Sequence, residues 1–202
     1  MRKNTTIKAL TAAAAAALVV TGCSNGAGGS HDGHDATSTS SKPSAQFNDA
    51  DVQYAQGMTM HHEQAVEMSD IILEKSGIDP DVVKLAKQIK KAQGPEIKEM
   101  QSWLKDWGQD GSTMDHGGSD GMGMDHDGML SSKDLTKLKD ANGEQASKLF
   151  LDQMIEHHQG AVKMAKEHRK DGKNSDAMQL SADVIRDQNA EIKDMRKMRA
   201  SL

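Results

Sequence analysis

The sequence has few aromatic residues, a single cysteine and no excess of basic over acidic residues. Of its 202 residues, 2% are aromatic and one is a cysteine. A sheet-rich fold is disfavoured, because β-structure relies on aromatic and β-branched side chains. A single cysteine excludes a disulfide and a zinc site of several thiolates within one chain. With 25 Lys and Arg against 30 Asp and Glu, the net charge of −5 argues against nucleic acid as a partner.

The first residues have the pattern of an export signal. Arg2, Lys3 and Lys8 precede an uncharged, alanine-rich run over residues 9–20 that ends in small residues before Cys23. The run is too short to span a bilayer and has the size of a signal-peptide core. Because the junction resembles a bacterial lipobox, we expect cleavage before Cys23 and lipid modification of its sulfur. The alternative is an ordinary secretory signal with an incidental thiol.

The lipid anchor would hold the protein at the cell envelope. This means the outer face of the cytoplasmic membrane, or the periplasm or outer membrane of a diderm cell. The next segment is rich in Gly, Ser, Thr and Ala without apolar periodicity, which predicts a flexible, disordered tether. The predicted organisation is a signal peptide (1–22), a tether (23–46) and one helical domain (47–202) with a first half (47–108), a linker (109–131) and a second half (132–202).

The helical domain contains one unit twice. Residues 54–68 match residues 150–164 at a constant offset of 96, and residues 85–100 match residues 180–195 at an offset of 95. Two matches in the same order indicate a duplicated pair of helices. Met58, His61, His62, Ala65, Val66 and Met68 recur as Met154, His157, His158, Ala161, Val162 and Met164. Gln93, Glu96, Ile97, Lys98 and Met100 recur as Gln188, Glu191, Ile192, Lys193 and Met195.

Each half is predicted to form a helix–turn–helix unit. Asn48 and Asp79-Pro80 are good starts for two helices that end near residues 75 and 107. Gly94-Pro95 predicts a kink or a brief break in the second of these. The second half is expected to begin with a short segment from Ser132, weakened at Asn142-Gly143, and to continue as a helix that ends near residue 170. The last helix is expected to start near Asn174 or Ser175 and to end near residue 200. Two antiparallel pairs predict an all-α, four-helix bundle.

Helical spacing places histidine between methionines on the inner face of each unit. Met58, His61 and Met68 share one stripe, and Met154, His157 and Met164 repeat it. The adjacent histidines lie about 100° around the helix, toward a neighbouring helix or the bundle flank. Imidazole and thioether without thiolate suit copper better than zinc. The predicted ligands of Cu(I), with Cu(II) or Ag(I) as further candidates, are Met58, His61, His62, Met68, Met154, His157, His158 and Met164.

Further side chains could orient these ligands or add to them. Gln93 with Glu96, and Gln188 with Glu191, lie three residues apart and would orient the imidazoles. The linker is too polar and glycine-rich to pack, and a loop of this length is usually functional or disordered. The auxiliary ligand candidates are Met60, His168, Met114, His116, Met122, Met124, His126 and Met129. In the alternative interpretation, the methionines fill the core and the glutamates are solvated.

At these residues the sequence resembles the bacterial family known as domain of unknown function 305. Its hallmarks are Met-x-x-His-His-x-x-Ala-hydrophobic-x-Met on one helix and Gln-x-x-Glu-Ile-x-x-Met on the next, and both occur twice here, within about residues 47–200. The resemblance implies a ferritin-like bundle, usually exported, and copper binding or copper resistance as in some members. This chain departs from the common form at Thr59-Met60 and in its long linker.

Three functions compete on this evidence. The first is a copper-binding lipoprotein that sequesters or buffers copper, or exchanges it with a donor or acceptor protein. The second is a ferritin-like metallo-oxidase. Di-iron bundles need Glu-x-x-His on their helices, and no helical histidine here has an acidic residue three positions before it, so we expect no enzyme. The third is a bundle that binds a protein partner, with the histidines as polar core and no tight metal site.

Overall fold

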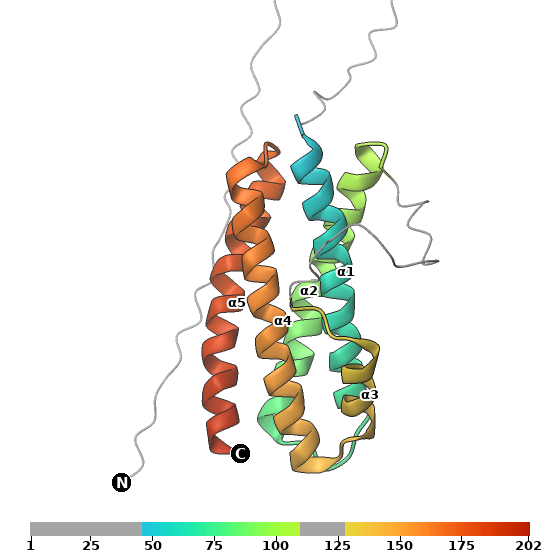
Figure 1. Ribbon diagram of the computed structural model, residues 1–202, viewed down its shortest axis with the longest axis vertical. Coiled ribbons are helices and arrows are strands. Elements are labelled where there is room, and N and C mark those ends of the chain that lie inside the picture. The colour runs from blue at the N-terminus through green and yellow to red at the C-terminus, as the bar shows by residue number, and fades with distance from the viewer. Residues whose placement is uncertain (1–45, 110–127) are drawn as a thin grey trace, which may run out of the picture. The chain divides into compact units, whose positions relative to one another are not determined.

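The computed structural model describes residues 46–109 and 128–202, which form helices and no strand within those ranges. α1 (Asp49–Leu73) and α2 (Pro80–Asp106) form one antiparallel hairpin, and α4 (Gly143–Asp171) and α5 (Ser175–Ser201) form the other (Figure 1). A short helix, α3 (Ser132–Asp140), lies beside α1. The predicted all-α bundle is confirmed. Cys23, the tether and most of the linker lie outside the described residues.

The helices begin where capping side chains are available. Asn48 accepts a hydrogen bond from the Asp51 backbone, and Asp51 accepts one in return from the Asn48 backbone, at 3.1 and 2.8 Å. This reciprocal pair is a capping box, which satisfies backbone donors that the first turn leaves free. Asp79 caps α2 ahead of Pro80, and Asn174 caps α5. The helix starts expected from the sequence are therefore correct.

Of the kink or brief break predicted at Gly94-Pro95, the break does not occur, because α2 is continuous from Pro80 to Asp106. The kink stays a prediction. Proline removes one backbone hydrogen bond and crowds the carbonyl of the preceding turn. Pro95 and Lys91, which supplies that carbonyl, are both exposed, so water can satisfy the freed oxygen. Buried Ile89 and Met100 hold the helix against the core on either side of the proline.

The expected weak point at Asn142-Gly143 separates α3 from α4. Ala141 has an extended backbone, and Gly143 has a φ of 56°, a left-handed conformation that glycine adopts without strain. α3 is fixed by the fully buried Leu138 and by a hydrogen bond from Gln153 to the Asp134 carbonyl oxygen at 3.0 Å. Burial of one leucine contributes about 1.5–3 kcal/mol, which anchors a helix too short to be stable alone.

The core consists of two apolar clusters, one on each side of the histidine pairs. Along both α1 and α4, the histidines lie between residues of one cluster and residues of the other. The Phe150 cluster includes Ala65, Met68, Ile72, Ile89, Leu138, Phe150, Met154 and Met195. The Tyr54 cluster includes Tyr54, Met58, Met100, Leu104, Ala161, Leu180 and Val184. None of the helices in the described part is long and apolar enough to cross a membrane.

A buried polar network joins the start of α1 to the α4–α5 connection. The fully buried carboxylate of Asp51 accepts backbone hydrogen bonds from Lys173 and Asn174 at 3.0 and 3.1 Å. It also pairs with His168 Nε2 at 2.8 Å, while His168 Nδ1 contacts Ser181 Oγ. Burial alone would raise the pKa of Asp51, but the hydrogen bonds from His168 and the backbone hold that pKa below its ordinary value.

Replacing Asp51 with asparagine should lower the free energy of unfolding at pH 7 by about 2–3 kcal/mol, because it removes charge-assisted hydrogen bonds in a buried site. The folded-state pKa is depressed, so this stabilisation is present above the ordinary pKa of 3.8 and is lost as pH falls through the lower, folded value. Urea unfolding at a series of pH values measures the effect. The exposed Asp49→Asn is the matched control and should change stability by only a few tenths of a kcal/mol. A constant difference between wild type and Asp51→Asn down to pH 3 would contradict the assignment.

Candidate metal centre

The two histidine pairs meet where α1 and α4 cross. His61, His62, His157 and His158 are each at most 1% exposed. The rings of His61 and His157 lie 3.7 Å apart between centroids, at an interplanar angle of 41°. The His157 and His158 rings are 6.4 Å apart. The duplicated sequence therefore brings its two copies of the motif to one place in the core, although the copies are far apart in the chain.

His62 and His158, the second and outer histidines of the two pairs, are each held by a glutamate of a neighbouring helix. His62 Nε2 lies 2.8 Å from Glu96 Oε2 on α2, and His158 Nε2 lies 2.7 Å from Glu191 Oε2 on α5. A carboxylate can only accept, so Nε2 carries the proton in both rings. In the neutral imidazole, Nδ1 is then left with a lone pair, and it has no hydrogen-bond partner in either ring among the described residues. A lone pair in this state is the form that binds a metal.

His157 is fully buried, as are His62 and His158. Neither of its ring nitrogens has a hydrogen-bond partner in the described part of the chain. Burial, followed by the electrostatic effect of the neighbouring histidines, lowers the pKa of His157 well below its ordinary value. The ring is therefore neutral at physiological pH and offers a nitrogen lone pair in a water-poor environment. A buried polar group without a partner costs stability, which calls for an explanation beyond packing.

Thioether sulfur flanks the histidines on both sides. Each apolar cluster takes methionines from both halves of the repeat, because α1 and α4 run in opposite directions. Met58, Met100 and Met164 meet at the Tyr54 cluster, and Met68, Met154 and Met195 meet at the Phe150 cluster. Met164 is half-buried and the other five are fully buried. Gly57 leaves room for Met164, whose Cε would lie 3.0 Å from a β-carbon at that position.

Met100 and Met195 were not among the ligands predicted from the sequence, although the repeat contained the signal for them. Both end the motif of the second helix, and both are fully buried next to the predicted methionines. The amides of Gln93 and Gln188 lie one turn before the two glutamates. Each is buried, and its Oε1 has no hydrogen-bond partner in the described residues. Among the described residues, the hydrogen bonds to His62 and His158 therefore come from the glutamates and not from the two glutamines.

The auxiliary candidates are placed differently. His168 lies about three helical turns beyond His157, and both of its nitrogens are used by Asp51 and Ser181. These contacts favour a structural role over metal binding. Met60 is half-buried in α1, and Met129 lies in the short segment before α3. Met114, His116, Met122, Met124 and His126 lie outside the described residues.

The end of the linker is fixed beside the histidine pair. The Gln64 side chain accepts from the Leu130 backbone nitrogen at 2.7 Å and donates to the Leu130 carbonyl oxygen at 3.0 Å. Gly128 packs so closely on α4 that an added β-carbon would lie 2.6 Å from the Glu156 carbonyl oxygen and 3.0 Å from that of His157. Gln64 and the docked stretch of α4 each lie within a turn of a central histidine. The segment containing Met129 is therefore held over the crossing of α1 and α4.

Nitrogen and oxygen ligands alone do not converge here. In the ranges 46–109 and 128–202, no three His, Cys, Asp or Glu side chains are arranged so that they could hold a metal ion together. Hard ions such as Mg²⁺ and Ca²⁺ need several oxygens, and structural zinc needs four N, O or S ligands. Apart from Glu96 and Glu191, the donors in the clusters on either side of the four imidazoles are thioethers, which select soft ions. The arrangement thus favours a soft metal.

Fold and centre together define a helical-bundle protein built from a duplicated hairpin, with histidines and methionines at the crossing of its inner helices. The chain belongs to the family described as "Domain of unknown function (DUF305)", which it matches over residues 51–199. The predicted family is therefore confirmed. No curated protein sequence matches the chain.

Solved structures of the family share the fold. A DUF305 fragment from Deinococcus radiodurans is 29% identical, with a TM-score of 0.65 over 77% of this chain and 98% of that one. A DUF305 protein from Streptomyces coelicolor, described as a candidate secreted protein, is 30% identical, with a TM-score of 0.67 over 75% and 91%. CopM in its Cu(II)-bound form is 32% identical, with a TM-score of 0.63 over 75% and 96%. CopM has also been solved with Cu(I) and with silver.

Replacing Gly128 with alanine should detach the linker end from α4. Gly128 has a φ of 77°, and Gly108 has a φ of 69° but no atom of the described residues within 4 Å of an added β-carbon. Gly108→Ala is therefore a matched control that carries only the left-handed backbone penalty, about 1–2 kcal/mol. Gly128→Ala should lose more stability than the control in urea unfolding, and its Leu130 amide should exchange hydrogen faster. Equal losses in the two variants would show that the contact with α4 contributes nothing.

Proposed function

We propose that this protein is an exported, lipid-anchored copper-binding protein that sequesters, buffers or transfers copper at the cell envelope. The observation that carries the proposal is the meeting of four buried imidazoles between two groups of methionines. In the described part of the chain, His62, His157 and His158 each have a ring nitrogen without a hydrogen-bond partner. Copper-bound and silver-bound structures of the similar protein CopM support it. The lipobox-like sequence at Cys23 supports the anchor.

In this proposal the histidines and methionines share the work of holding the ion. The imidazoles of His61 and His157 and the Nδ1 atoms of His62 and His158 supply nitrogen. The thioethers of Met58, Met68, Met154 and Met164 supply sulfur. Since thioether is a soft ligand that does not form disulfides, Cu(I) is favoured in an oxidising compartment, and Ag(I) is its close chemical analogue. Glu96 and Glu191 fix the orientation and proton of the outer rings.

Burial of these donor atoms makes the centre selective, but it lowers the free energy of unfolding of the metal-free protein. The nitrogens of His157 are buried with no hydrogen-bond partner among residues 46–109 and 128–202, which destabilises the folded state without an ion. An ion bound only by the folded state would recover that free energy through linkage. Replacing a metal-binding histidine should therefore weaken metal binding without destabilising the metal-free protein. Replacing a purely structural histidine should destabilise the protein and leave metal affinity unchanged.

Replacing His157 with leucine should leave the metal-free protein as stable as the wild type, or up to about 1 kcal/mol more stable, because an unpaired buried imidazole is removed. The same change should weaken Cu(I) binding about tenfold or more, since one ligand is lost. Urea unfolding without metal and an anaerobic Cu(I) competition titration measure the two effects.

His168→Leu is the control for this experiment. It leaves the buried Asp51 carboxylate without its imidazole partner, so it should destabilise the fold by about 3 kcal/mol or more and leave Cu(I) affinity unchanged. Unchanged Cu(I) affinity in His157→Leu would refute the helical centre. Absence of tight Cu(I) binding in the wild type would favour the protein-binding bundle instead.

Replacing Glu96 and Glu191 together with glutamine should weaken Cu(I) binding about tenfold or more, because an amide can donate as well as accept and no longer selects one tautomer of His62 and His158. The exposed Glu63, next to His62 in sequence, provides the matched Glu63→Gln control. The competition titration described above measures both. If the double variant binds as tightly as Glu63→Gln, the glutamates do not orient the ligands.

A further inference from the structure

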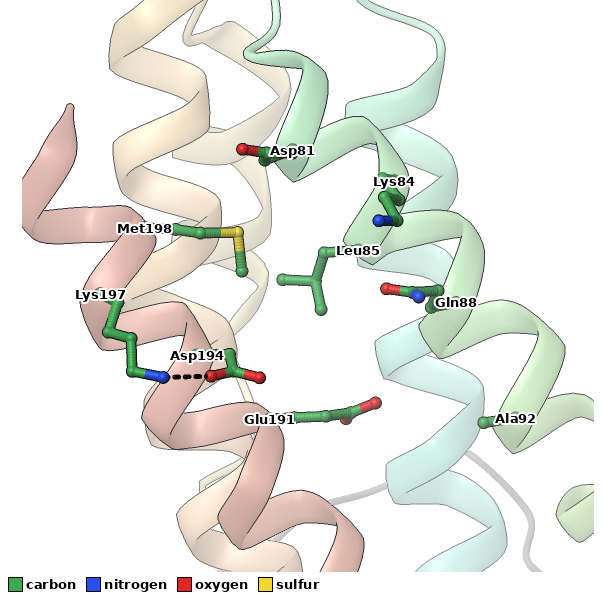
Figure 2. A pocket seen from close by; sticks show the side chains of 9 residues that line it. All are labelled: Asp81, Lys84, Leu85, Gln88, Ala92, Glu191, Asp194, Lys197 and Met198. Carbon is green, nitrogen blue, oxygen red and sulfur yellow. Dashed lines mark hydrogen bonds and ion pairs between the residues drawn. The ribbon is translucent and has the colours of Figure 1, made fainter. Parts of the chain in front are cut away.

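The four central histidines are fully buried, so an ion can reach them only through an opening in the bundle. α1 packs closely on α2 and on α4, and α4 packs closely on α5, whereas α2 and α5 meet only sparsely. A groove of about 540 Å³ lies between α2 and α5 (Figure 2). Leu85 and Ala92 line it from α2, and Glu191, Asp194 and Met198 line it from α5. The bundle is therefore open along this side.

One residue connects the groove with the histidines. Glu191 lines the groove and keeps 28% of its side chain exposed, and its Oε2 lies 2.7 Å from Nε2 of the fully buried His158. In Figure 2 this side chain extends from α5 across the groove toward α2. A species that enters the groove thus meets a carboxylate that is in direct contact with a histidine of the centre.

The lining suits a soft cation. Three carboxylates, from Asp81, Glu191 and Asp194, face two ammonium groups, from Lys84 and Lys197, so the groove carries an excess of negative charge. Lys197 is already paired with Asp194 at 2.7 Å. The Met198 sulfur projects between α5 and α2 in Figure 2. Negative charge in a cleft raises the local concentration of cations, and a thioether gives a soft cation a transient contact on its way through the groove.

The first half of the repeat has a different side chain at the position equivalent to Met198. At the offset of 95, Glu191 corresponds to Glu96 and Met198 corresponds to Trp103. Trp103 stacks on Trp107 at 6.1 Å between ring centroids and packs against the Tyr54 cluster, to which residues of α5 belong. A thioether in one half is thus replaced by a large indole in the other. The two halves share the histidine motif but differ in the side chain at this position.

From these observations we infer that the groove between α2 and α5 is the route by which the metal ion enters and leaves the centre, reaching it at Glu191 and His158. This inference rests on the proposed copper-binding function and adds to it the path that the ion takes. Because a route lowers a barrier without changing either end state, blocking it should slow binding and release by the same factor and leave the affinity unchanged.

The test places the indole of the first half into the second. Met198→Trp in the full chain should slow Cu(I) uptake from a chromogenic chelator about tenfold or more in anaerobic stopped-flow measurements. Cu(I) affinity from equilibrium competition with the same chelator should stay within about twofold of wild type. Ala92→Trp, at an exposed position of α2 in the same groove, is a second variant that should give the same result if Met198→Trp folds poorly.

Ala190→Trp is the matched control, because Ala190 is exposed on α5 and does not line the groove. It should leave rate and affinity unchanged. Uptake at the wild-type rate in both groove variants would overturn the inference, as would a loss of affinity equal to the loss of rate, which would make Met198 a ligand instead. Failure of the wild type to bind Cu(I) would refute the proposed function itself, and the two failures are thereby distinguishable.

Discussion

The close approach of His61 and His157 is the constraint on which the rest of the structure depends. Two imidazoles with centroids 3.7 Å apart, between two largely apolar clusters, are costly to bury. The surrounding packing must therefore hold them there. The Tyr54 and Phe150 clusters do so from either side, because each buries residues of both α1 and α4. The two clusters stabilise the bundle, and the four histidines between them supply the groups that can bind a ligand.

Duplication explains why the contact between α1 and α4 around the histidine pairs is nearly symmetric. Because α1 and α4 run in opposite directions, the first methionine of one motif lies level with the last methionine of the other. Met58 accordingly shares a cluster with Met164, and Met68 shares one with Met154. A single hairpin could not make either group, since each needs both halves. The same symmetry places His62 against Glu96 and His158 against Glu191 at nearly equal distances.

The departures from symmetry are as informative as the repeat. Gln64 binds the returning linker at Leu130, while Gly160 of α4 lies at the corresponding position and leaves space for Gly128 to dock. The position of Met198 is taken by Trp103 in the first half. Selection for packing alone would not require one half to differ from the other in this way. The similar protein CopM has been crystallised with copper and with silver.

The sequence by itself determined the helices, their starts at Asn48, Asp79 and Asn174, and the inner stripe of Met58, His61 and Met68, because caps and periodicity are local. It left a kink or a break open at Gly94-Pro95, and the helix does not break there because burial of the flanking turns outweighs the local cost of proline. Only the tertiary structure decided that His61 meets His157, that His168 binds Asp51 instead of joining the centre, and that Met100 and Met195 complete the methionine groups. These depend on which helices pack together and in which direction, and a spacing within one helix contains no such information.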